Sequence, residues 1–165
     1  MTDYHIGDIV LSSSDNFDSE LSYLWVWHAD KIPPHIGIST KNNYFSLKAS
    51  GKDEALEIGW VLRLIERKKI VTLAFQMKDS ILLSTIKDVF ANESKAESNG
   101  KTCLGPVKEI LGVRAAVKIH DLLDTLYERK ELEQVIGFNV DDSFKGIPMY
   151  ELEEIFDRLK KLEDV

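Results

Sequence analysis

Two short segments separated by a tight turn constrain the fold more than any other part of the sequence. Residues 35–39 read His-Ile-Gly-Ile-Ser and residues 44–48 read Tyr-Phe-Ser-Leu-Lys, so apolar side chains alternate with other types. A period of two is typical of β-strands. The intervening Lys41-Asn42-Asn43 is a turn signal, which predicts an antiparallel hairpin. The fold is therefore expected to contain a sheet built around this hairpin.

The first 78 residues are expected to be rich in strands. Segments 9–11 and 70–77 are predicted strands, whereas 54–66 fits either a strand or a helix. Segment 17–29 is predicted to be helical, because its apolar residues have helical spacing and Asp18 or Ser19 could cap it. The apolar positions behind this prediction are Phe17, Leu21, Leu24 and Trp25. Pro33-Pro34 would end that helix.

The remaining residues, 79–165, are expected to be mainly helical. Amphipathic or capped patterns predict four helices, at 80–90, 106–111, 115–127 and 148–162. A strand is predicted at 135–140, and the small polar residues of 91–101 predict an exposed loop. Together these patterns indicate an α+β chain that forms a single domain over residues 1–165.

Charge and hydropathy exclude several classes of partner. The chain has 28 acidic and 21 basic residues, a net charge of -7, which argues against nucleic acid or an anionic membrane surface as the main partner. No apolar run approaches the roughly 20 residues of a membrane span, and the first residues lack a signal pattern. A cytoplasmic protein is therefore expected, with homo-oligomerisation left open.

Cys103 is the only cysteine, which excludes an internal disulfide and a multi-cysteine zinc site. No phosphate-binding or metal-binding motif is present, so neither a cofactor nor a metal is expected. If Thr102 caps a helix that starts here, Cys103 lies in the first turn, where the helix dipole should lower the thiol pKa. Such a thiol suits a nucleophile. The alternative is a buried cysteine that only packs.

A cysteine nucleophile needs a base, and His35 is the best-placed of the four histidines. In the predicted strand, His35 shares a face with Gly37, which leaves room for a chain segment or a substrate to approach. Ser46 on the neighbouring strand could orient the imidazole. The aromatic residues Trp25, Trp27 and Tyr44 could wall a substrate groove beside it, although most such clusters are core.

The order of these features resembles that of a known superfamily. Gly-Asp-Ile-Val-Leu at 7–11, Pro-His-Ile-Gly-Ile at 34–38, and Cys103, which stands 68 residues after His35, resemble the circularly permuted NlpC-type papain-like hydrolases. That superfamily includes the lecithin retinol acyltransferase-like proteins. The resemblance implies a papain-like fold, with a small antiparallel sheet packed against helices and extra C-terminal helices. It also implies a Cys-His pair that cleaves or transfers an amide, ester or thioester acyl group.

Three functional hypotheses follow. The first is a cysteine hydrolase or acyltransferase, acting on a small-molecule or peptide acyl substrate with Cys103 as nucleophile, His35 as base and Ser46 as the orienting residue. The second is a catalytically inactive papain-like module that binds a partner in the aromatic groove. The third is a subunit of a larger assembly that docks through the helix at 148–162.

Overall fold

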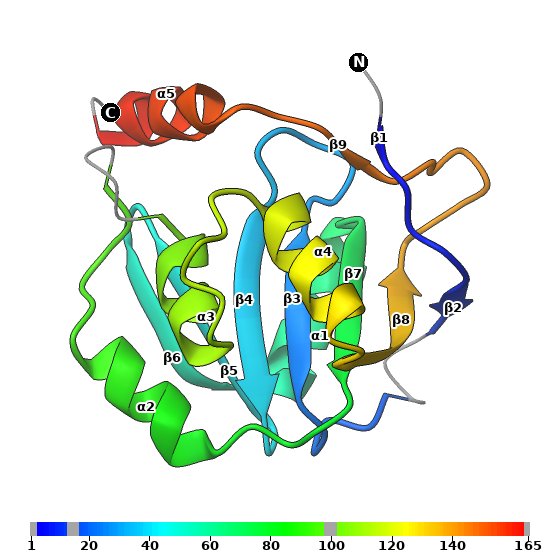
Figure 1. Cartoon of the computed structure of the whole chain (residues 1–165), viewed down its shortest axis with the longest axis horizontal. Helices are drawn as coiled ribbons and strands as arrows, with labels where there is room; N and C mark the ends of the chain where they lie inside the picture. The colour runs from blue at the N-terminus through cyan, green and yellow to red at the C-terminus, as the bar shows by residue number, and fades with distance from the viewer. Residues whose placement is uncertain (1–2, 13–16, 98–101, 164–165) are drawn as a thin grey trace.

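The computed structural model describes residues 3–12, 17–97 and 102–163, and it has the mixed α+β architecture expected from the sequence (Figure 1). Its main element is an open seven-stranded sheet in the order β2-β8-β7-β3-β4-β5-β6. These strands are β2 (Ile9–Leu11), β3 (Tyr23–Trp27), β4 (His35–Thr40), β5 (Asn43–Lys48), β6 (Gly51–Glu57), β7 (Thr72–Met77) and β8 (Leu132–Phe138).

Helices cover both faces of the sheet. The helices in the described part of the chain are α1 (Ile58–Lys68), α2 (Leu83–Ala91), α3 (Leu104–Ile110), α4 (Ile119–Glu128) and α5 (Leu152–Glu163). Helix α1 packs on one face, and α2, α3 and α4 pack on the other with the apolar side of α5 (Figure 1). Within the described segments, no helix combines the length and the apolar character that a membrane crossing requires.

The sheet differs from the small antiparallel sheet that the resemblance implies. It has seven strands, and β2 runs parallel to β8, while the other neighbouring strands are antiparallel. Strand β8 comes from the mainly helical second half and lies between β2 and β7. A second, two-stranded sheet pairs β1 (Asp3–Tyr4) with β9 (Ile147–Pro148). Both ends of the chain thus contribute to its sheets.

The predicted helix at 17–29 is wrong, because this region contains the central strand β3. All five residues of β3 are buried. Leu24 and Val26 belong to the core beneath α2, α3 and α4, whereas Tyr23, Trp25 and Trp27 belong to the core beneath α1. A strand covered on both faces is apolar at every position, so it lacks the alternation that identifies a half-exposed strand.

The predicted hairpin is confirmed. Strands β4 and β5 pair from Thr40↔Asn43 to Gly37↔Ser46. The turn residues Lys41 and Asn42 both have positive φ, 49° and 66°, as tight hairpin turns of the primed type require. The ambiguous segment 54–66 divides between the two readings, since β6 ends at Glu57 and α1 begins at Ile58.

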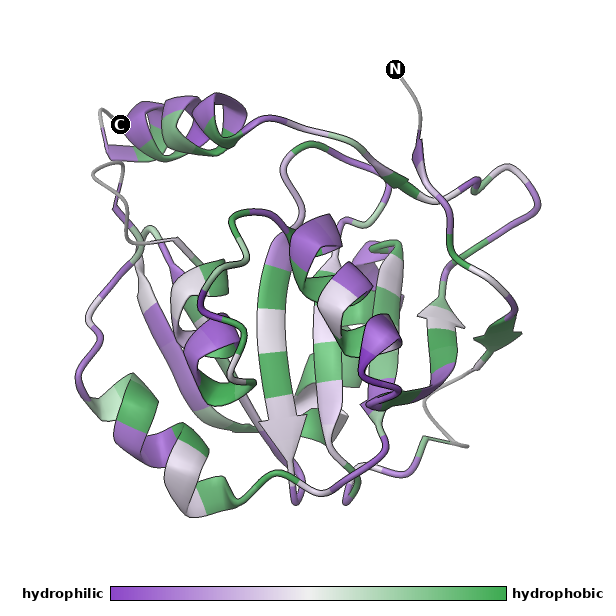
Figure 2. Cartoon of the chain, viewed as in Figure 1, coloured by the Kyte–Doolittle hydropathy of each residue, from purple (hydrophilic) through white to green (hydrophobic). Residues whose placement is uncertain are grey.

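The hydropathy of the residues along the ribbon follows the same pattern of burial (Figure 2). The central strands β3 and β4 are coloured mainly as hydrophobic or intermediate residues, and α5 carries a hydrophobic side and a hydrophilic side. Ile155 and Leu159 are the buried residues of α5 and belong to the main core. The apolar side of α5 is therefore used within the chain, which favours a core role over a docking role for this helix.

The close approach expected at Gly37 is made by the chain itself. A Cβ atom at Gly37 would overlap the phenol ring of Tyr44, which lies across the backbone of β4. Tyr44 is 1% exposed, so its ring cannot swing into solvent without leaving the core. Glycine at this position thus allows the ring of Tyr44 to pack against the sheet.

Gly37→Ala is expected to lower the free energy of unfolding by about 2 kcal/mol, because the added methyl group overpacks a closed site. Chemical denaturation measures this change. Gly105→Ala is the matched control, since a Cβ there meets no atom within 4 Å, and it should not destabilise the fold. In a Tyr44→Leu background the cost of Gly37→Ala should shrink. Equal costs in both backgrounds would contradict the overlap.

Candidate active site

Cys103 occupies the N-cap position of α3, directly before the first helical residue, Leu104. Its side chain makes no capping hydrogen bond, and Thr102 lies outside the helix, so the expected Thr102 cap is wrong. Helix α3 packs against β4, and Cys103 is a partly buried residue at the edge of the main core. The sequence therefore located the helix start to within two residues but misplaced its cap.

Cys103 and His35 line the same cavity. It has a volume of about 250 Å³ and lies between the beginning of β4, the start of α3 and the helix α5. Most of its wall is apolar, contributed by Pro33, Pro34, Ile36, Leu47, Ala49, Ala96, Leu104, Ile155, Leu159 and Leu162. The polar residues that accompany the pair are His28, Lys48, Thr102, Tyr150 and Arg158. This cavity is the candidate active site.

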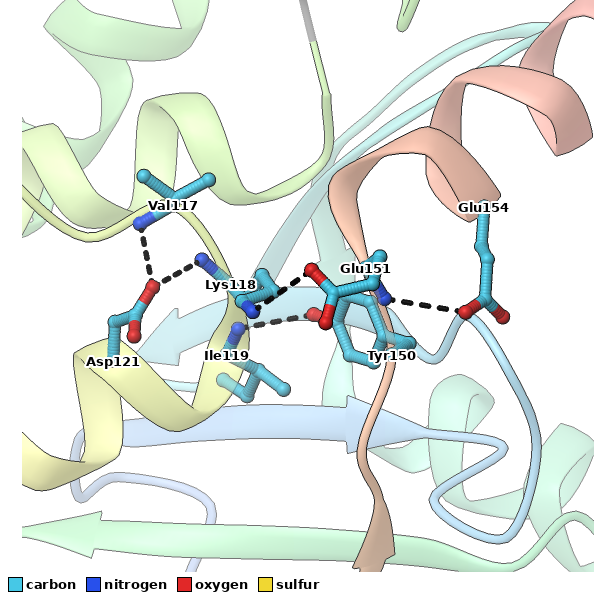
Figure 3. A network of polar contacts seen from close by, with 7 residues as sticks. All are labelled: Val117, Lys118, Ile119, Asp121, Tyr150, Glu151 and Glu154. Atoms are coloured by element: carbon cyan, nitrogen blue, oxygen red, sulfur yellow. Dashed lines mark hydrogen bonds and ion pairs between the residues drawn. The ribbon is translucent and has the colours of Figure 1, made fainter. Parts of the chain in front are cut away.

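The helix α5 closes one side of this cavity and is held in place by a polar network at its beginning (Figure 3). The hydroxyl of Tyr150 accepts a hydrogen bond of 3.0 Å from the main-chain N–H of Ile119, the first residue of α4. Lys118 Nζ lies 3.6 Å from the carboxylate of Glu151. The carboxylate of Asp121 caps α4 by accepting from the main-chain N–H of Lys118. The entry to α5 is thereby fastened to the start of α4.

The segment before Cys103 forms another side of the cavity. The sequence predicted an exposed loop at 91–101, but Ala96 is 2% exposed and its N–H donates to the carbonyl of Lys48 at 2.7 Å. The exposed-loop prediction is therefore wrong at Ala96. Residues 98–101 lie outside the described part of the chain.

His35 is the first residue of β4, and its side chain lies on the α1 face of the sheet. Its ring contacts Trp27 edge-on, with the centroids 6.3 Å apart. The Nε2 atom is buried without a hydrogen-bond partner. Burial lowers the His35 pKa to about 4, although the nearby carboxylate of Asp53 opposes this shift. The imidazole is therefore neutral at neutral pH and can accept a proton.

The thiol of Cys103 is also neutral at neutral pH. Burial raises its pKa to about 11, and contacts with the backbone of Ile36, Cys103 and Leu104 offset only part of this effect. The expected lowering of the pKa by a helix dipole is wrong, because desolvation of the enclosed sulfur outweighs it. In the resting state the two groups form a thiol and an imidazole rather than a thiolate and an imidazolium.

Ser46 lies fully buried on β5, opposite Gly37, and its hydroxyl donates to Asp53 Oδ2 at 3.1 Å. Asp53 also pairs with Lys48 at 2.9 Å. The carboxylate raises the pKa of His35, so Asp53 favours the protonated imidazole. Sequence reasoning missed Asp53 because the segment it considered as a strand began at residue 54, after the first residues of β6. The Ser50-Gly51 pair after a strand was the turn signal that could have located it.

The three aromatic residues predicted to wall a groove take different positions. Trp25 is fully buried, and its Nε1 donates to Ser39 Oγ at 2.7 Å, which is the environment of a core residue. Trp27 and Tyr44 line a second cavity together with His35. Gly37 lies beneath the ring of Tyr44.

Among residues 3–12, 17–97 and 102–163, no group of three or more His, Cys, Asp and Glu side chains could hold a metal ion. Comparison of the chain with protein-family models, curated proteins and solved structures found no match.

Alkylation of Cys103 by iodoacetamide is expected to accelerate about tenfold per pH unit from about pH 7 to about pH 10, because only the thiolate reacts. No plateau should appear in this range, since the thiol pKa is about 11. Mass spectrometry of the native protein follows the reaction. A plateau between about pH 5 and about pH 7 would contradict a neutral resting pair and reveal a thiolate stabilised by imidazolium.

Acidification should destabilise the fold through His35. Its pKa is about 4 in the folded chain and 6.5 without burial, so the unfolded chain binds this proton first. Stability should fall as the pH drops through this window, by up to about 3 kcal/mol. Denaturation of the native protein and His35→Gln at each pH gives the difference. Equal slopes for both proteins would contradict a buried neutral His35.

Proposed function

We propose that this protein is a papain-like cysteine hydrolase or acyltransferase that acts in the cytoplasm on a peptide, isopeptide or acyl-amide. The observation that carries the proposal is that Cys103 and His35 line one cavity, although they come from different elements and lie 68 residues apart. The apolar wall of that cavity suits an acyl group. The order of motifs along the chain supports the same conclusion.

In the proposed reaction, the sulfur of Cys103 attacks the carbonyl carbon while His35 takes the thiol proton. Because both groups start neutral, proton transfer accompanies the attack rather than preceding it. The carbon–heteroatom bond then breaks, and the imidazolium returns the proton to the leaving group. Water or an acceptor nucleophile attacks the resulting thioester and releases Cys103. This step regenerates the thiol.

Two features near the pair support charge stabilisation in this scheme. The main-chain N–H groups that lower the Cys103 pKa, those of Ile36, Cys103 and Leu104, would also stabilise negative charge on the tetrahedral oxygen. The carboxylate of Asp53 would stabilise the imidazolium of His35 through its charge. Ser46 would hold that carboxylate through its hydrogen bond.

The second candidate is a papain-like binding module without turnover. The observation that favours it is the raised pKa of the Cys103 thiol, which leaves little thiolate at neutral pH. Such a module would use the same cavity to hold a ligand and would leave Cys103 unmodified.

The two candidates are separated by a panel of p-nitrophenyl esters, anilides and thioesters, with release of the leaving group and intact mass as the readouts. For the enzyme, Cys103→Ala is expected to lower kcat/KM by roughly a thousandfold, and His35→Ala by roughly a hundredfold or more. The native protein should gain the acyl mass on Cys103.

Two histidine variants serve as controls for this experiment. His5→Ala should leave the rate unchanged, because His5 does not line the candidate site. His28 does line it, so a large loss in His28→Ala with none in His35→Ala would transfer the role of base to His28. No turnover and no acyl mass across the panel would favour the binding module.

A further inference from the structure

A second cavity lies on the other side of β4, beneath α1. Its volume is about 180 Å³. Its polar wall comes from the sheet and includes Trp27, His35 and Tyr44, and its apolar wall includes Leu56, Val61 and Leu64. It borders His35 as the candidate active site does, but Cys103 does not line it.

Three of the residues that line this cavity carry a buried polar atom without a hydrogen-bond partner. These atoms are Trp27 Nε1, His35 Nε2 and Tyr44 Oη, and they make up three of the four such side-chain atoms in the described residues. Trp27 is 8% exposed and Tyr44 is 1% exposed. Trp27 and Ser46 lie within hydrogen-bonding reach of the Tyr44 hydroxyl and lower its pKa, but these contacts leave both Trp27 Nε1 and the Tyr44 hydroxyl without a satisfied hydrogen bond. A buried polar atom without a hydrogen bond costs free energy. Three such atoms on residues of one cavity therefore indicate that a bound molecule supplies their hydrogen-bond partner.

All three groups can donate a hydrogen bond. The indole of Trp27 is a donor only. Burial holds the pKa of the Tyr44 hydroxyl well above its ordinary value, so the hydroxyl keeps its proton. His35 is neutral and carries one N–H. A complementary partner therefore presents an oxygen that accepts hydrogen bonds.

The charges at the cavity indicate a neutral partner. Lys48 and Asp53 line it, but they neutralise one another at 2.9 Å. An anion would have no unpaired cation to meet, and burying it would cost much more than burying a neutral carbonyl. His28 also lines the cavity, and burial lowers its pKa, which disfavours its cationic form. The rest of the wall is apolar and includes Trp60, which is 49% exposed.

We propose that this cavity binds a small neutral carbonyl compound, such as an amide, with its oxygen toward Trp27 and Tyr44 and its apolar part against Leu56, Val61 and Leu64. The cavity shares His28, His35 and Lys48 with the candidate active site, but Cys103 does not line it and binding there requires no chemistry at Cys103. Its test therefore uses a binding readout, which remains informative whether or not the chain turns over a substrate.

The experiment is a titration of the ¹⁵N-labelled protein with benzamide, read at the indole N–H signal that disappears in Trp27→Phe. A saturable shift of this signal is expected. Benzoate and toluene, which match benzamide in shape, should bind at least about tenfold more weakly, because one carries a charge and the other lacks the oxygen.

Two variants locate the site. Leu64→Trp fills the cavity from its apolar wall, keeps all three donors, and should abolish the shift. The matched control, Leu82→Trp, adds the same bulk at a position that is 70% exposed and should bind as the native protein does. Tyr44→Phe should weaken binding about tenfold. If Tyr44→Phe does not fold, the presence or absence of the Trp27 shift in Leu64→Trp still tests whether benzamide binds in this cavity.

Several outcomes would overturn the proposal. An unmoved Trp27 signal at saturating benzamide would mean that water alone pairs these atoms. A shift confined to Trp60 would indicate a surface contact, and persistence in Leu64→Trp would place the ligand elsewhere. Tighter binding of benzoate would make the site one for anions, and equal binding of toluene would make the donors irrelevant.

Discussion

Burial of β3 and β4 on both faces is the constraint on which the rest of the structure depends. Successive residues of β4 point to opposite cores, so Ile36 packs beneath α3 while His35 lies on the α1 side. Cys103 approaches from the α3 side, where the backbone of Ile36 contacts its sulfur. The two groups share a cavity only because His35 is the first residue of its strand, where the sheet ends.

The same burial sets the chemical state of the site. Desolvation is the largest influence on the pKa of both Cys103 and His35, and it favours the uncharged form of each. Main-chain amides near the sulfur lower the pKa of Cys103, and Asp53 raises the pKa of His35. Both effects are smaller than the opposite effect of burial. Both side chains are therefore uncharged at neutral pH.

Sequence patterns predicted the elements that have one exposed face or a strong local signal. The β4–β5 hairpin has alternation and a turn, and α4 has an amphipathic pattern, so both were found. Strand β3 was mistaken for a helix because tertiary burial on both faces removed its alternation. For the candidate site, the sequence singled out Cys103 and His35, which line one cavity. Asp53 was not singled out, since it comes to the site through pairing of β6 with β5, a contact that composition alone does not reveal.

The position of β8 has a consequence for how the chain is made. This strand lies between β2 and β7, but it is synthesised more than a hundred residues after β2. During translation β2 has no neighbour in the sheet, and β7 has an unpaired edge, until residue 138 has left the ribosome. Such an arrangement delays completion of the sheet and exposes a strand edge that can pair with other chains. The unpaired edge of β7 can therefore take part in aggregation until β8 has been synthesised and has paired with it.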